Sequence, residues 1–159
     1  MKILVLNCGS SSVKYQVFSI DGDGHQAQSL AGGIVEKVGL ESPFLKHKRP
    51  GTHDYEMENL PVRDHKDAIK LVLDVISDPE YGVLDSVQDL DAIGHRIVHG
   101  GEEFASSVII DDSVVKAVYD NIELAPLHNP PNIQGIEAIT ALLPDVPQVG
   151  VFDLSLIHI

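Results

Sequence analysis

The feature that constrains this chain most is a short apolar strand that runs directly into a serine-rich turn. Residues 3–6 are continuously apolar, as in strands that are buried on both faces. Residues 7–14 follow with the polar sequence NCGSSSVK. Gly9 lets the backbone approach a ligand closely, the serines add hydroxyl donors to exposed peptide N–H groups, and Lys14 adds positive charge. This turn has the donors and the charge that bind a phosphate.

The turn alone leaves its role open. The P-loop pattern G-x-x-x-x-G-K-[ST] is absent, and residues 13–20 have the pattern of a strand where a P-loop has a helix. A serine-rich hairpin turn with a solvated lysine is an equally good interpretation. Cys8 is the single cysteine of the chain and forms no internal disulfide, and we expect it to fill space in the turn.

The charge of the chain limits the ligands that it can attract. Its 159 residues are enough for one compact domain with a core. The formal net charge of −13 argues against holding nucleic acid or an anionic membrane through the general field. The sequence has neither an apolar run of the ~18 residues that span a membrane nor a secretory signal, so we expect a cytoplasmic protein. An anionic substrate therefore requires a locally basic pocket.

The first third of the chain is predicted to open a sheet. Antiparallel strands are expected at residues 3–6, 13–20 and about 29–38. Residues 39–61 are polar and contain prolines, and we interpret them as an insertion or flap. We expect a solvated surface for the basic cluster in this segment, with a binding role as the alternative: Lys46, Lys48 and Arg49.

Three helices and two strands are predicted in the rest of the chain, in the order helix, strand, helix, helix, strand. Asp64 is predicted to cap a helix that ends before Pro79, and Asn129 is predicted to cap another. The other predicted elements are a helix at about 112–122 and strands at 90–98 and 148–152. This order predicts a mixed α/β fold in which helices cover a sheet that starts antiparallel and continues through crossovers.

Polar signatures follow the core strands, at residues 7–14, 96–101 and 152–153. Ligands of open α/β sheets bind beyond the strand ends, so we expect these groups to meet at one edge. Arg96 and Val98 share one face of their strand by the period of two. A guanidinium beside a branched apolar side chain suits a small molecule with a carboxylate and a short alkyl group. A local ion pair of Arg96 is the alternative.

The histidines near these signatures are ambiguous. His95 and His99 have the spacing of a helical metal pair, but on a strand they would lie ~13 Å apart, too far for one ion. We therefore expect no zinc site there. His128 precedes the predicted helix start and either acts on an anion or has a structural role.

Four segments together resemble the acetate kinase family: NCGSSSVK at 7–14, GHRIVHGGE at 94–102, APLHNP at 125–130 and VFD at 151–153. The resemblance covers residues 1–153. It implies the N-terminal domain of a two-domain kinase with the actin/Hsp70-like (ribonuclease H-like) fold. It also implies reversible, Mg²⁺- or Mn²⁺-dependent transfer of the γ-phosphoryl group of ATP to acetate, giving acetyl phosphate and ADP, by a full-length homodimer.

The resemblance also implies roles for individual residues. These are Asn7 at the metal and the transferring phosphoryl group; Ser10, Ser11, Ser12 and Lys14 at the ATP phosphates; Arg96 at the substrate carboxylate; Val98 and Leu127 around the methyl group; His128 at the transferring phosphate; and Asp153 as the catalytic acid. Acetate is already ionised at neutral pH, because its carboxyl pKa is near ~4. A metal-positioning role for Asp153 therefore makes more sense than base catalysis.

Residues 154–159, with the sequence LSLIHI, depart from the family pattern, and we interpret them as a foreign tail on a truncated gene read. The adenosine pocket would lie in a missing second domain, so we expect the chain alone to be inactive. A propionate or butyrate kinase is one alternative, since one carbon is worth only about 1 to 3 kcal/mol in binding. A noncatalytic anion-binding domain is the other.

Overall fold

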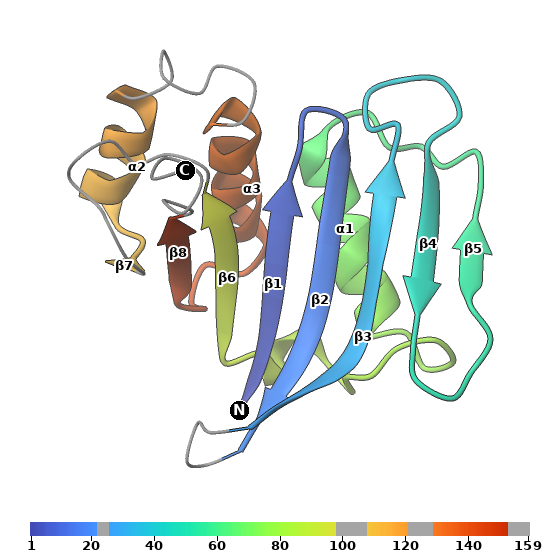
Figure 1. Cartoon of the computed structure of the whole chain (residues 1–159). Helices are drawn as coiled ribbons and strands as arrows, with labels where there is room; N and C mark the ends of the chain where they lie inside the picture. Colours follow the sequence, from blue (N-terminus) through green and yellow to red (C-terminus); the bar gives the residue numbers. More distant parts are fainter. Residues whose placement is uncertain (22–25, 98–107, 121–128, 153–159) are drawn as a thin grey trace, which may run out of the picture.

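The computed structural model describes residues 1–21, 26–97, 108–120 and 129–152. They form one eight-stranded mixed sheet with helices packed against it, in the strand order β5-β4-β3-β2-β1-β6-β8-β7 (Figure 1). The strands are β1 (Lys2–Cys8), β2 (Ser12–Ile20), β3 (Ala27–Glu36), β4 (Phe44–Lys48), β5 (Tyr55–Met57), β6 (Ala92–Ile97), β7 (Val108–Ile109) and β8 (Gln148–Phe152). The helices are α1 (His65–Ile76), the short 3₁₀ helix η1 (Val87–Asp89), α2 (Asp112–Asp120) and α3 (Asn129–Leu142).

The central strands run as the sequence predicts. β1, β2 and β3 pair antiparallel in succession, and β6 and β8 continue the sheet parallel to β1. The carboxyl ends of β1, β6 and β8 therefore lie at the same edge of the sheet, where the turn between β1 and β2 also lies (Figure 1). The fold thus brings together at one edge the strand ends that carry the polar signatures.

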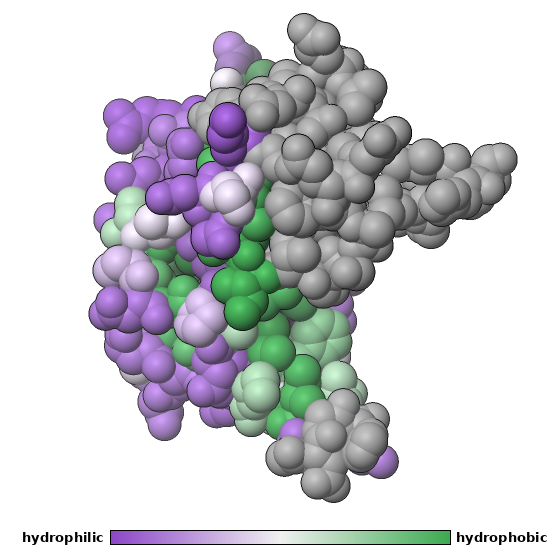
Figure 2. All heavy atoms as spheres, turned by 90° about the vertical axis from the view of Figure 1, so that its left-hand side faces the viewer, coloured by the Kyte–Doolittle hydropathy of each residue, from purple (hydrophilic) through white to green (hydrophobic). Residues whose placement is uncertain are grey.

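The main core lies between the sheet and helices α1 and α3, which cover the same face (Figure 1). Alternate residues of each strand point into it, because successive side chains of a strand point to opposite faces. The largest side chains that are fully buried there include Leu4, Leu6, Val13, Val17, Ile69, Ile76, Ile93 and Ile139. Seen from the side of β7 and β8, hydrophobic side chains form a band through the middle of the view, beside a mostly hydrophilic surface (Figure 2).

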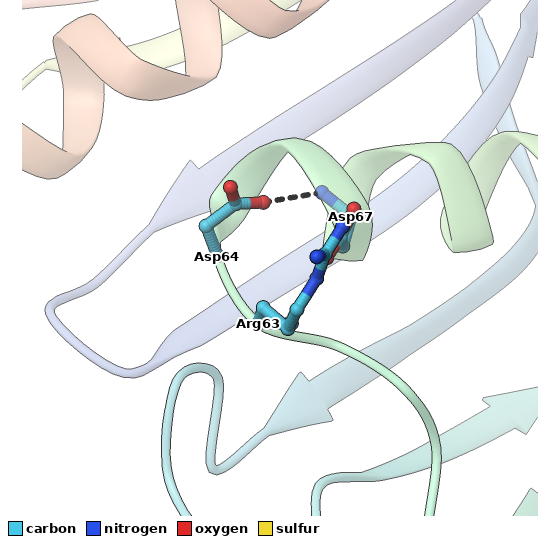
Figure 3. A network of polar contacts seen from close by, with 3 residues as sticks. All are labelled: Arg63, Asp64 and Asp67. Carbon is cyan, nitrogen blue, oxygen red and sulfur yellow. Dashed lines mark hydrogen bonds and ion pairs between the residues drawn. The ribbon is translucent and has the colours of Figure 1, made fainter.

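The start of helix α1 confirms the predicted cap. Asp64 has an extended backbone, and its Oδ1 accepts a hydrogen bond of 2.8 Å from the Asp67 N–H (Figure 3). The Asp67 carboxylate accepts bonds from the backbone N–H and the Nε of Arg63, at 3.0 and 3.2 Å. The Asp64–Asp67 bond satisfies an N–H group that the first helical turn leaves without an intrahelical partner, and the Arg63 bonds hold the residue before the cap against that turn. The helix therefore begins at a well-defined residue.

The interpretation of residues 39–61 as a flap is wrong. This segment contains β4 and β5, which extend the sheet beyond β3. In β4, Leu45 and His47 are buried, and a buried histidine hid the alternating strand pattern. Its polarity is satisfied, because the Tyr15 hydroxyl lies 2.6 Å from Nδ1 and the Tyr81 carbonyl 2.9 Å from Nε2. The two-residue strand β7 was not predicted either.

Candidate active site at the strand ends

Asn7, Lys14 and Arg96 occupy neighbouring positions on three adjacent strands. The Cα atoms of Asn7 and Lys14 are partners in the β1–β2 pair. Leu6 of β1 is the partner of His95 of β6, so the residues that follow, Asn7 and Arg96, are also neighbours. All three candidate site residues line one hollow of about 740 Å³. They alternate with core residues of their strands and so lie on the face opposite to α1 and α3.

The hollow is basic although the chain is acidic. Lys14, Lys48, Arg49 and Arg96 line it, together with Asp54. The Lys48 ammonium lies 3.8 Å from the Asp54 carboxylate, and both side chains are exposed. Four of the eleven Lys and Arg residues of a chain with a net charge of −13 therefore surround one site. This is the locally basic pocket that an anionic ligand requires.

The serine turn is closed by its own backbone. The Gly9 N–H donates a bond of 2.8 Å to the Ser12 carbonyl, and the Ser11 carbonyl accepts one of 3.0 Å from the Val38 N–H. A Cβ on Gly9 would lie 2.8 Å from the Ser12 Oγ, so a larger residue at position 9 would require the Ser12 side chain to move. Ser10 is exposed, while Ser11 and Ser12 are half-buried.

His65 is a contact of this turn that the sequence analysis missed. It is the first residue of α1, and its Nε2 lies 2.6 Å from the Gly9 carbonyl oxygen. The two residues are 56 positions apart in the chain, so no local pattern could have revealed the bond.

Cys8 is a packing residue, as expected. It is buried beside Gly135 of α3, where a Cβ would lie 2.7 Å from the Cys8 Sγ. Burial raises the pKa of the Cys8 thiol to about 12, so the thiol stays protonated. The missing side chain of Gly135 thus lets α3 approach the end of β1 closely.

His95 anchors the strand that carries Arg96. Its Nε2 donates a bond of 2.7 Å to the Gln148 Oε1, and the Gln148 amide donates one of 2.9 Å to the Thr140 Oγ1, which donates to the Ile136 carbonyl at 2.9 Å. Burial lowers the pKa of His95 to about 4, so the ring is neutral at pH 7. This chain of bonds joins β6, β8 and α3 beneath the hollow, because His95 and Arg96 point to opposite faces.

The structure does not describe every predicted site residue. Val98, Leu127, His128 and Asp153 lie outside the described residues. Ile97 and Phe152, the last described residues of β6 and β8, are partners in the sheet. One buried polar atom in the described part of the chain, the Asn132 Nδ2 in the first turns of α3, has no hydrogen-bond partner.

The acetokinase family model matches residues 2–159. The chain belongs to the acetokinase family. It is 56% identical over 155 residues to the acetate kinase of Natranaerobius thermophilus, a match that covers 98% of this chain and 38% of that protein.

Solved structures of the acetokinase family have the same fold. The crystal structure of Porphyromonas gingivalis acetate kinase superposes with a TM-score of 0.90 at 46% identity, over 97% of this chain and 37% of that one. A propionate kinase from Francisella tularensis subsp. tularensis superposes with a TM-score of 0.79 at 35% identity, over 97% of this chain and 37% of that one. The predicted actin/Hsp70-like fold is confirmed by these structures.

Two further findings concern the length of this acetokinase-family chain and its helices. The chain spans about 38% of the length of the curated relatives that it matches. Among the helices that the structure describes, none combines the length and the apolar character needed to cross a bilayer.

Proposed function

We propose that this chain is the N-terminal part of an acetate kinase, which transfers the γ-phosphoryl group of ATP to acetate and forms acetyl phosphate and ADP. The observation that carries the proposal is the row of Asn7, Lys14 and Arg96 in one basic hollow at the strand ends. An amide, an ammonium and a guanidinium at neighbouring positions can hold a carboxylate and a phosphate close together. Membership of the acetokinase family supports the same reaction.

Arg96 binds the acetate carboxylate in this proposal. Its planar guanidinium matches the two oxygens of a carboxylate and orients one of them for attack on phosphorus. Acetate is ionised at neutral pH, since its carboxyl pKa is near ~4, so the reaction needs no general base to remove a proton. The chain therefore contributes mainly alignment and charge neutralisation, which dominate phosphoryl transfer.

The turn between β1 and β2 binds the ATP phosphates in this proposal. Ser10, Ser11 and Ser12 supply hydroxyl and backbone donors, and Lys14 neutralises phosphate charge. The turn is braced by the Gly9–Ser12 and Ser11–Val38 backbone bonds, so its donors are fixed before the ligand arrives.

The described residues fit a divalent cation that arrives with the nucleotide. Mg²⁺ usually keeps several waters and takes only one or two protein ligands besides the substrate phosphates. The described residues contain no cluster of three or more His, Cys, Asp or Glu side chains that could hold a metal by itself. The Asn7 amide oxygen would meet Mg²⁺ or Mn²⁺ beside the triphosphate, and Asp153 would position its waters. When bound, the ion would neutralise the charge of the transferring phosphoryl group.

The remaining site residues complete this proposal from outside the described part of the chain. Val98 and Leu127 form the methyl pocket, and His128 contacts the transferring phosphate. Residues 1–153 form the N-terminal domain, and residues 154–159 are a foreign tail. In this proposal a second domain of the complete enzyme binds adenosine, so the 159-residue chain alone is inactive. We also propose that the complete enzyme is a homodimer.

Propionate is the second candidate substrate, because a propionate kinase shares 35% identity and the fold. One methylene changes discrimination by only about 1 to 3 kcal/mol, so the two reactions differ in degree.

The test measures acyl phosphate as its hydroxamate with acetate, propionate and butyrate, using the complete protein that contains this chain. We expect the highest kcat/KM with acetate and no product from the 159-residue chain alone. A preference for propionate would support the second candidate. Absence of product with all three acids would refute both.

A further inference from the structure

The bond between His65 and Gly9 joins the candidate phosphate-binding turn to the core of the domain. His65 is 7% exposed, and its Nε2 lies 2.6 Å from the Gly9 carbonyl oxygen. A carbonyl oxygen can only accept, so Nε2 carries a proton and donates it in this bond. The histidine therefore fixes the direction of one particular peptide group, the one between Gly9 and Ser10.

The direction of that peptide decides where a donor of the turn points. In a trans peptide the C=O and the N–H of the next residue point in opposite directions, and the described residues contain no cis peptide bond. Because the Gly9 C=O points toward α1, the Ser10 N–H points away from the helix. Ser10 is an exposed residue, and its N–H lies on the side of the turn that faces away from α1.

The element that carries His65 is rigid. Asp64 caps α1 directly before it through the 2.8 Å bond to the Asp67 N–H (Figure 3). Ala68 and Ile69, in the first turns of the helix, are fully buried in the core. A donor on such an element holds its acceptor more precisely than a donor on a loop does.

The two backbone hydrogen bonds of the turn do not fix the orientation of the peptide between Gly9 and Ser10. The Gly9 N–H and the Ser12 carbonyl close the turn, and the Ser11 carbonyl is bound by Val38. Neither bond involves the Gly9 carbonyl, and glycine lacks the Cβ that restricts rotation of its own peptide planes. The peptide that is freest to rotate is thus the one that His65 binds.

We infer that His65 is a positioning residue, whose hydrogen bond to Gly9 aims the Ser10 N–H at a phosphate group of bound nucleoside triphosphate. The inference rests on the proposed function, in which the serine turn binds the ATP phosphates. His65 acts through Gly9 and does not itself touch the nucleotide.

Substitutions at His65 separate this role from simple packing. His65→Gln keeps an N–H donor at nearly the position of Nε2, whereas the shorter amide of His65→Asn cannot reach the Gly9 carbonyl. Both variants are polar and uncharged, so they differ mainly in reach. His65→Leu removes the donor and keeps apolar volume. His53→Gln is the matched control, because His53 is an exposed histidine in the connection between β4 and β5.

The measurements are the KM for ATP, the KM for acetate and the Kd for MgATP in the complete protein, with the thermal unfolding temperature of each variant. We expect His65→Asn and His65→Leu to raise the KM and Kd for ATP about tenfold, the usual effect of one lost bond to a charged group, with the KM for acetate within about twofold. His65→Gln should recover most of the ATP affinity, and His53→Gln should behave as wild type.

Three results would overturn the inference: equal ATP affinity in the Gln and Asn variants, equal changes in the KM for both substrates, or a change in unfolding temperature alone. If the Leu variant fails to fold, the Gln and Asn pair decides the question. If wild type binds MgATP but forms no acyl phosphate, the proposed reaction is wrong, while the Kd values still test the role of His65.

Discussion

Asn7 and Lys14 lie directly opposite each other across β1 and β2, and both line the basic hollow. Opposed residues of an antiparallel pair project from the same face with Cβ atoms about 4.5–5.5 Å apart. The serine turn is the connection between these two residues, so a phosphate bound at the turn is within reach of both side chains. The short hairpin therefore places an amide, an ammonium and several N–H donors around a single anion.

Replacement of Lys14 tests the charge of this arrangement. Lys14→Met keeps most of the side-chain length and removes the ammonium. We expect the KM for ATP in the complete protein to rise about tenfold or more, since bonds to charged groups are worth roughly 1.5–3 kcal/mol. The rate of acetyl phosphate formation at varied ATP measures the change. Lys70→Met is the control, because Lys70 is exposed on α1, and a similar effect of both substitutions would contradict the assignment.

The contact between Gly135 and Cys8 predicts a destabilising alanine. A helical Gly→Ala change normally gains up to about 1 kcal/mol. At Gly135 the new Cβ would lie 2.7 Å from the Cys8 Sγ, and such overpacking costs about 1–3 kcal/mol. We therefore expect Gly135→Ala to lower the free energy of unfolding, measured by urea denaturation.

A double variant tests whether contact with the Cys8 sulfur causes this loss of stability. Cys8→Ala removes the sulfur, so Gly135→Ala made in that background should cost nothing or should stabilise the protein. A loss of the same size in both backgrounds would show that the sulfur is not the obstacle.

The buried His95 predicts a loss of stability in mild acid. Its pKa is lowered from 6.5 to about 4 by burial, so below pH 6.5 the unfolded chain binds a proton that the folded chain does not. The contribution of neutral His95 to the free energy of unfolding is therefore complete above pH 6.5 and is lost as the pH falls toward 4. We expect His95 to account for about 2 kcal/mol of lost stability between pH 7 and pH 5.

His95→Gln isolates this contribution, since it removes the titrating ring and keeps an amide that can reach Gln148. Urea denaturation at both pH values should show a smaller acid-induced loss in the variant than in wild type. Equal losses in the variant and in wild type would mean that other groups cause the whole effect. His47 is one such group, because burial lowers its pKa as well.

Local sequence patterns predicted the helices and strands that are determined by residues close together in the sequence. The apolar run at residues 3–6 marked the central strand β1, and the Asp64 cap marked the start of α1. The β4 strand was missed because His47 is buried in a position where the pattern calls for an apolar residue, and only its tertiary bonds to Tyr15 and Tyr81 explain that burial.

The sequence predicted part of the candidate site, as it predicted part of the fold. The polar signatures at residues 7–14 and 96–101 identified Asn7, Lys14 and Arg96, which the sheet topology then placed side by side. His65 could not be predicted, since it meets Gly9 only through the packing of α1 against the sheet. The roles of Val98, Leu127, His128 and Asp153 stay predictions.

Arg96 is the residue on which the proposed acetate site depends most. Arg96→Lys keeps the positive charge and removes the planar fork that binds both carboxylate oxygens. Arg63→Lys is the matched control, because Arg63 is an exposed arginine that precedes the cap of α1.

The decisive measurement is the KM for acetate of the complete protein, from initial rates of acetyl phosphate formation at saturating ATP. For Arg96→Lys we expect a rise of about tenfold to one hundredfold, as for loss of a bond to a charged group, with the KM for ATP and the Arg63→Lys variant near wild type. An unchanged KM for acetate in Arg96→Lys would contradict the placement of the substrate carboxylate in this hollow.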